Sequence, residues 1–180
     1  MVDERKRTVL LGLAFLVLLM LSSVENAFFF QILSSVLQNQ YLAVAMLFMH
    51  NVLVISLIIL GMTFYVNLVS TFFKKEKYGS VILEHPRTFA LVFTLVIVFL
   101  SILRGSNMLY GEIDVEALPL ILLISAPIGI VEGYGIYLTI KKTLSNTMSM
   151  KELAFIYGIF FIAAIMEVAF INILAWISKG

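Results

Sequence analysis

Five long apolar runs follow one another along this chain of 180 residues. They lie at 8–24, 41–73, 88–103, 118–140 and 153–177. Each run reaches or approaches the roughly 20 residues that an α-helix needs to cross about 30 Å of hydrocarbon. Helices are favoured over a β-barrel, because backbone amides in lipid must pair within their own segment and these runs do not alternate in period two. The sequence therefore predicts an all-α polytopic transmembrane helical bundle.

The composition agrees with a membrane protein of one domain. Hydrophobic residues make up 62% of the chain and charged residues 13%, whereas soluble domains have about 45–50% apolar and about 25% charged residues. No repeat and no linker rich in glycine, proline or serine divides the chain, so we expect a single integral membrane domain over 1–180. The second run is longer than one crossing requires, and the five predicted spans are therefore 8–24, 42–64, 88–103, 118–140 and 153–177.

The basic residues sort by membrane side. Most of them precede the first run or lie in the second-to-third and fourth-to-fifth loops: Arg5, Lys6, Arg7, Lys74, Lys75, Lys77, Arg87, Lys141, Lys142 and Lys151. The opposite side carries Arg104, Lys179 and the acidic run Glu112, Asp114 and Glu116. By the positive-inside rule we expect the N-terminus inside, the C-terminus outside, and a multi-pass location in the cytoplasmic membrane. The net charge of +1 gives no reason to expect a nucleic-acid partner.

The ends of the first run raise two further questions. A basic start followed by an apolar stretch resembles a signal peptide, but Glu25 occupies the small-residue position of the cleavage site, so we expect an uncleaved anchor. After it, apolar residues recur at steps of three and four from Phe29 to Leu37. This pattern predicts a separate amphipathic helix at the outer interface or over the mouth of the bundle, between the first two spans. The alternative is a bent continuation of the first helix.

Two acids, Glu132 and Glu167, lie inside apolar runs. An ionised side chain at the centre of a bilayer costs roughly 2.5 kcal/mol or more, so such residues usually face other helices, a partner or a wet cavity. His50 and Asn51 lie in the outer half of the second span. Two nearby carboxylates in a poor solvent do not both stay ionised, so at least one is expected to hold a proton or meet a partner. We predict a buried polar centre of Glu132, Glu167, Asn51 and His50.

Four functions compete for this centre. The first is to hold the helices in register, since hydrogen bonds between helices stabilise membrane bundles. The second is a path for protons or ions, and the third is a docking place for a partner's transmembrane helix. A metal hydrolase is disfavoured because no H-E-x-x-H or comparable spacing is present. The absence of cysteine excludes thiolate sites and disulfides. We therefore expect no enzyme, no catalytic residue, no cofactor and no metal.

Proline and glycine are expected to shape the helices around the centre. Pro127 predicts a kink in the fourth span. Gly129 and Gly133 form a G-x-x-x-G face, and Gly61 lies in the second span. Ala154 and Gly158 form a similar small-residue pair at the start of the fifth span. Because small residues let helices approach closely in lipid, we expect a homodimer or a complex with other membrane proteins, surrounded by membrane lipid.

Three segments resemble the stage II sporulation protein M family. Residues 48–52, Phe-Met-His-Asn-Val, with Gly61 further on, are similar to the family's asparagine-valine-leucine-rich second span. Residues 126–132 resemble its Pro-His-Gly-x-x-Glu motif, with Ile128 in place of the histidine. Residues 163–167 resemble its alanine-rich last span, which closes on glutamate. The resemblance covers nearly the full length and implies a five-span fold.

The resemblance also implies a role. In sporulating bacteria the family member is similar to an anchoring subunit that holds a peptidoglycan-remodelling complex during engulfment, and other members occur in bacteria and archaea that do not sporulate. If the missing histidine handles protons in the family, His50 would have to replace it here. We therefore expect a non-enzymatic membrane scaffold or anchoring subunit for partner proteins. The alternative is a small transporter or channel component whose acids bind a proton, a cation or a polar solute.

Overall fold

The computed structural model describes residues 4–37, 39–72, 77–110, 116 and 118–177. Within these ranges the regular structure is entirely α-helical, which confirms the predicted all-α class. The helices are α1 (Glu4–Val36), α2 (Gln40–Phe72), α3 (Lys77–Glu84), α4 (Pro86–Tyr110), α5 (Leu118–Leu144) and α6 (Met150–Ile177). Three stretches in the described residues are long and apolar enough to cross a membrane: Glu4–Asn26, Gln40–Phe72 and Met150–Ile173. The apolar part of α4, Pro86–Ser101, is shorter.

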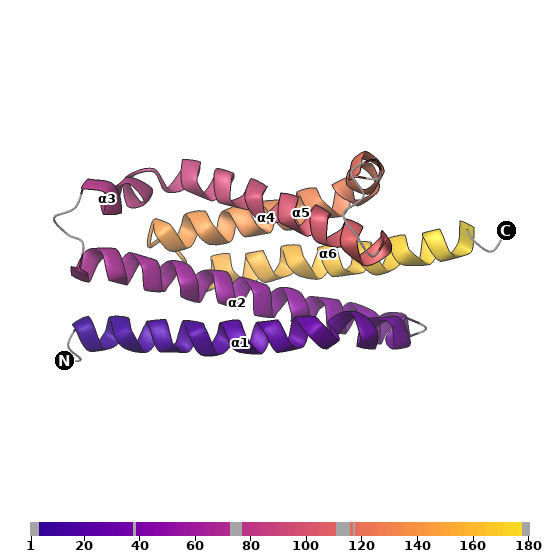
Figure 1. Cartoon of the computed structure of the whole chain (residues 1–180), viewed down its shortest axis with the longest axis horizontal. Helices are drawn as coiled ribbons and strands as arrows, with labels where there is room; N and C mark the ends of the chain where they lie inside the picture. The colour runs from indigo at the N-terminus through magenta and orange to yellow at the C-terminus, as the bar shows by residue number, and fades with distance from the viewer. Residues whose placement is uncertain (1–3, 38, 73–76, 111–115, 117, 178–180) are drawn as a thin grey trace.

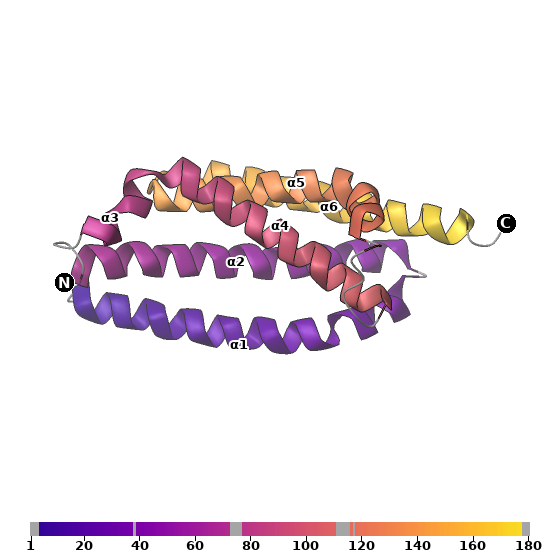
Figure 2. The same ribbon diagram turned by 45° about the horizontal axis from the view of Figure 1, so that its top comes forward.

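The long helices lie side by side along one axis (Figure 1). Helix α2 is central, because it packs against α1, α5 and α6, while α4 packs against α5 and α5 against α6. Helix α1 lies at the edge of the bundle and is held by α2 (Figure 2). The outer surface is strongly apolar: Leu10, Met20 and Ile130 are 67–71% exposed. An apolar exterior on a helical bundle is what a lipid-facing surface requires.

Two glycines and two phenylalanines lock α1 onto α2. A Cβ added to Gly12 would lie 2.9 Å from the Phe64 ring, and one added to Gly61 would lie 2.8 Å from the Phe15 ring. The two rings stack with centroids 6.4 Å apart. Gly61, predicted to shape its helix, therefore makes room for an aromatic side chain of the neighbouring helix, as small residues do in close helix pairs.

The prediction of a separate amphipathic helix after the first run is wrong. Helix α1 continues unbroken from Glu4 to Val36, because no residue near Glu25 breaks a helix. Two apolar residues of its last turns, Phe29 and Leu33, face the bundle and are 3% and 6% exposed, whereas Ile32 is 50% exposed. Phe29 and Leu33 belong to an apolar cluster with Ala43, Leu47, Ala164 and Val168. The alternative, a continuation of the first helix, is the observed arrangement.

A second apolar cluster lies further along the bundle, toward the α5–α6 connection. It combines buried residues of α2, α4, α5 and α6: Ile55, Ala90, Ile136, Ile140, Leu144, Ile156 and Phe160. A Cβ added to Gly135 would lie 2.4 Å from the Phe160 ring, so α5 and α6 touch closely here. The two clusters leave a short stretch of α2 between Leu47 and Ile55, and Asn51 occupies it.

The α5–α6 connection is closed by local hydrogen bonds. The Thr147 amide donates to the Lys142 carbonyl and the Asn146 amide to the Thr143 carbonyl, both at 3.0 Å, and Asn146 has φ 52°. This is a Schellman ending for α5, with asparagine in the left-handed conformation. Ser149 and Glu152 then form a capping box at the start of α6, with donor–acceptor distances of 3.0 and 3.3 Å. The connection between α5 and α6, which carry Glu132 and Glu167, is therefore well defined.

Candidate functional site

Three helices bring Asn51, Glu132 and Glu167 together, and we call these three residues the acid site. Asn51 belongs to the buried stripe of α2 that recurs every four residues. Glu167 lies on the inward face of α6, flanked by buried Ala163, Ala164 and Val168. Glu132 of α5 directly precedes buried Gly133. Both glutamates are half-buried as whole residues and their carboxyl groups are turned inward.

Glu132 and Glu167 lie on α5 and α6, which pack against each other, and both helices also pack against α2, which carries Asn51. The Asn51 side chain is a polar neighbour of the Glu132 carboxyl group. Asn51 is 8% exposed, yet its Nδ2 has no hydrogen-bond partner within 3.5 Å among the described residues. An acid pair and a buried, unpaired N–H donor together make an incompletely bonded polar site.

His50 lies elsewhere, although it directly precedes Asn51. Its Nδ1 is 3.0 Å from both carboxylate oxygens of Glu25 on α1. Its ring stacks on Phe29 with centroids 4.2 Å apart. Successive residues of a helix point about 100° apart, so His50 faces α1 while Asn51 faces α5 and α6. The structure thus brings together three of the four predicted centre residues and places His50 in a separate pair with Glu25.

The sequence contained a signal for the Glu25–His50 pair. The connection between α1 and α2 lies near residue 38, which is almost equally far in sequence from both residues. In two antiparallel helices of equal rise, residues equally distant from the turn lie at the same depth. This symmetry places an acid opposite a histidine.

The residues expected to shape the helices take different positions. Pro127 is exposed and lies inside α5, whose first turns run at an angle to the rest of the helix in Figures 1 and 2. A Cβ added to Gly133 would meet Val98 and Thr94 of α4 at 3.5 and 3.7 Å. A Cβ added to Gly129 or Gly158 would meet nothing within 4 Å. Within the G-x-x-x-G face, Gly133 therefore packs against α4 of the same chain, whereas Gly129 is uncovered.

Thr94 is a further polar group that the sequence reasoning missed. It is 6% exposed, and its Oγ1 has no hydrogen-bond partner among the described residues. It faces Gly133, the residue that follows Glu132. A single threonine within the apolar stretch of α4 from 89 to 100 was the available signal.

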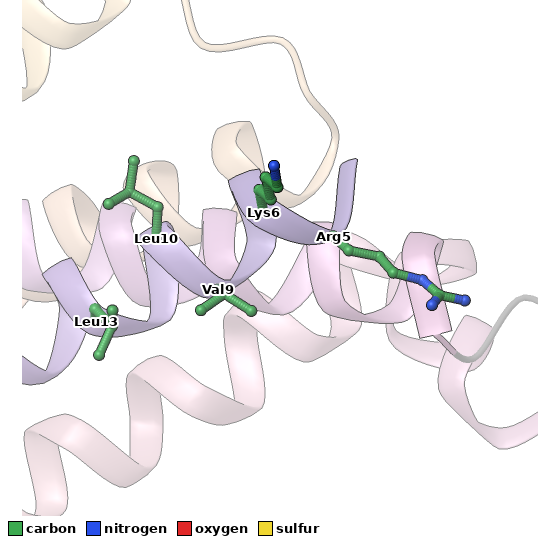
Figure 3. A pocket seen from close by; sticks show the side chains of 5 residues that line it. All are labelled: Arg5, Lys6, Val9, Leu10 and Leu13. Atoms are coloured by element: carbon green, nitrogen blue, oxygen red, sulfur yellow. The ribbon is translucent and has the colours of Figure 1, made fainter. Parts of the chain in front are cut away.

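A hollow at the start of α1 is shallow. Figure 3 shows its lining side chains spreading from one helix instead of converging: Arg5, Lys6, Val9, Leu10 and Leu13. Two basic residues followed by an apolar stripe are typical of a helix passing from headgroups into hydrocarbon. Within the described ranges no three side chains of histidine, aspartate or glutamate gather as metal ligands would.

The helices and their surface define an all-helical membrane protein. No protein-family model, curated protein or solved structure matches this chain. The likeness to the stage II sporulation protein M family, drawn from the short motifs around Asn51, Glu132 and Glu167, therefore stays a prediction.

Proposed function

We propose that this chain crosses the cytoplasmic membrane five times, with its N-terminus inside and its C-terminus outside. The five apolar runs and the sorting of basic residues support this topology. Helix α1 begins at one end of the long axis and α6 ends at the other (Figure 1), as an odd number of crossings requires.

We propose further that the chain is a small transporter or channel component that binds a proton or small cation at the acid site. The observation that carries this proposal is the buried Nδ2 of Asn51, which lacks a hydrogen-bond partner although α2 packs against the two helices that carry Glu132 and Glu167. A contact that served only to hold helices together would be expected to close its hydrogen bonds, because a buried unsatisfied polar group costs about 1–3 kcal/mol. Acids placed between membrane helices commonly belong to ion paths and proton relays.

Ion flux into liposomes tests this function. Purified protein is reconstituted into liposomes that enclose a pH-sensitive dye, and parallel samples carry gradients of Na⁺ or K⁺. We expect flux of at least one of these ions above that of protein-free liposomes, and loss of that flux in Glu132→Gln. Glu84→Gln is the matched control, since it neutralises an exposed acid at the end of α3. Wild-type liposomes as tight as empty ones toward H⁺, Na⁺ and K⁺ would refute the proposal.

A membrane scaffold or anchoring subunit, as the family resemblance implies, is the second candidate. The uncovered small residues favour it: a Cβ added to Gly158 would meet nothing within 4 Å, and Ala154, one turn away, is exposed. Such a face accommodates the close approach of a second helix, from another copy or from a different membrane protein. Under this function Glu132→Gln leaves the oligomer in mild detergent intact, whereas Glu132→Leu weakens it. An unchanged oligomer size in Glu132→Leu would count against it.

A further inference from the structure

We infer that the hollow at the start of α1 binds one anionic phospholipid. The charges of Arg5 and Lys6 hold its phosphate group, and its acyl chain follows Val9, Leu10 and Leu13. These five side chains line the hollow (Figure 3). The inference goes beyond the proposed function, because it holds whether or not ions cross the protein.

The contacts between α1 and α2 fix which side of α1 faces outward. Thr8 is buried; its hydroxyl group donates to the Glu4 carbonyl at 2.9 Å and lies 3.3 Å from Oγ1 of Thr71 on α2. Arg7 donates to Oδ1 of Asn67 on α2 at 2.6 Å. Successive residues of a helix turn by about 100°, so residues 5, 6, 9, 10 and 13 share the side opposite to these contacts.

Two cations lie at the headgroup end of the hollow. Arg5 and Lys6 are both exposed, and none of the residues that line the hollow is acidic. Glu4, the acid of the first turn, lies one turn before Thr8 and therefore on the α2 side of the helix. Guanidinium and ammonium groups donate charge-assisted hydrogen bonds to phosphate oxygens. Because a zwitterionic headgroup also carries a positive charge, the two cations favour an anionic headgroup.

The apolar end of the hollow continues as a row of exposed side chains. Val9, Leu10 and Leu13 are 56–67% exposed, and Val17 and Met20 extend the row on the same side at steps of four and three residues. One leaflet of hydrocarbon is about 15 Å thick, which corresponds to about ten residues of helix. The row from Val9 to Met20 therefore matches the length of an acyl chain within one leaflet.

A lipid suits this surface better than a protein helix or a free phosphate ion. The hollow is shallow and its lining comes from one helix, which offers a flexible chain one continuous row of contacts. Close approach of a second helix uses small residues, and Gly12 already accommodates the Phe64 ring of α2. A phosphate ion would meet the two cations but would gain nothing from the apolar row.

Quenching of tryptophan fluorescence by brominated lipids tests this inference on the full chain. Trp176→Phe removes the single native tryptophan, and Leu10→Trp places a reporter in the hollow. Liposomes of phosphatidylcholine contain increasing fractions of brominated phosphatidylglycerol or, in parallel, of brominated phosphatidylcholine. Each basic residue near an anionic surface strengthens attraction about fivefold, so we expect a preference of about 25-fold for the anionic lipid.

Phe155→Trp in the same background is the matched reporter. Phe155 is exposed and lies nearly as far from the start of α6 as Leu10 lies from the start of α1. We expect a much smaller preference for the anionic lipid at this position. Equal preference at the two reporters would overturn the site, because the charge of the whole end of the bundle would then explain the attraction.

Charge-removing variants identify the groups that hold the phosphate. In the Leu10→Trp protein, Arg5→Gln and Lys6→Gln are each expected to lower the preference about fivefold. Lys151→Gln is the control: it removes an exposed basic residue from the start of α6, at the same end of the bundle as the start of α1 (Figure 1), and should leave the preference unchanged. A loss in Lys151→Gln as large as in Lys6→Gln would contradict the inference.

Two measurements separate a lipid from a free anion and do not depend on the folding of a variant reporter. Inorganic phosphate, added at constant ionic strength, is expected to leave quenching by brominated phosphatidylglycerol unchanged, whereas displacement by phosphate would show that the cations bind the anion alone. Native mass spectrometry of the wild-type protein, from micelles with equal amounts of the two unlabelled lipids, is expected to retain phosphatidylglycerol. Retention of neither lipid, or of phosphatidylcholine alone, would overturn the inference.

Discussion

The contact between Gly135 and Phe160 provides a quantitative test of the α5–α6 packing. A Cβ on Gly135 would lie 2.4 Å from Cε2 and 2.8 Å from Cζ of Phe160, whereas carbon atoms in contact normally lie about 3.5–4.0 Å apart. Phe160 is 2% exposed and belongs to the apolar cluster around Ile140, so its ring has little space to move. Gly135→Ala should therefore force a rearrangement between the two helices that carry the acids.

The expected magnitude follows from two opposing effects. Overpacking a close-packed site typically costs about 1–3 kcal/mol. Replacing glycine by alanine within a helix stabilises it by roughly 0.5–1 kcal/mol. Gly158→Ala is the matched control, because it brings the same helix preference with no atom within 4 Å of the new Cβ. The difference between the two variants therefore isolates the clash, and we expect Gly135→Ala to be less stable by about 1–3 kcal/mol.

The free energy of unfolding in mixed micelles of a mild and a denaturing detergent measures this difference. A smaller residue at the clash should rescue the variant, so Phe160→Leu combined with Gly135→Ala is expected to be more stable than the sum of the single changes predicts. Equal stability of Gly135→Ala and Gly158→Ala would refute the close approach of α5 to α6 that positions Glu132 and Glu167.

Three further predictions concern the ends and edge of the bundle. Ser149→Ala removes the N-cap of α6, because the Ser149 hydroxyl oxygen accepts a hydrogen bond from the Glu152 amide at 3.3 Å. This change should lower the free energy of unfolding by about 1 kcal/mol in the same assay. Glu25→Gln and His50→Gln, combined in a double-mutant cycle, should show a coupling of about 0.2–1 kcal/mol, because both side chains are partly exposed; additive effects would contradict the contact. The chain has no cysteine, so Asn39→Cys and Ser145→Cys, both at exposed positions, can report orientation: an impermeant thiol reagent added outside cells should label only the first, and the reverse pattern would overturn the topology.

The helices were predictable because the solvent that surrounds them dictates their composition. In lipid, a long continuous apolar run satisfies its backbone hydrogen bonds by forming an α-helix. Helices α2 and α6 follow their runs closely. The end of α1 was not predictable in the same way. Phe29 and Leu33 recur at helical spacing whether the helix lies on a membrane surface or packs on α2, and periodicity does not identify the partner surface.

The residues of the acid site were predictable from the sequence, but the sequence did not show which of them lie on the same side of a helix. Glu132 and Glu167 stand out because carboxyl groups are costly among apolar residues. The sequence did not separate His50 from Asn51, since adjacent residues share a depth but not a helix face. The burial of Asn51 with Ala43, Leu47 and Ile55, at steps of four residues, decides which of the two faces the acids.

The close approach of Glu132 to Glu167 inside the bundle is the claim on which the whole account depends. Since the chain has no native cysteine, Glu132→Cys combined with Glu167→Cys can be treated in membranes with a short bifunctional thiol reagent. The comparison pair combines Glu132→Cys with Ile162→Cys, an outward position on α6 that is 54% exposed. We predict rapid intramolecular cross-linking of the first pair and little of the second. Cross-linking of the second pair alone would mean that the two acids do not face each other.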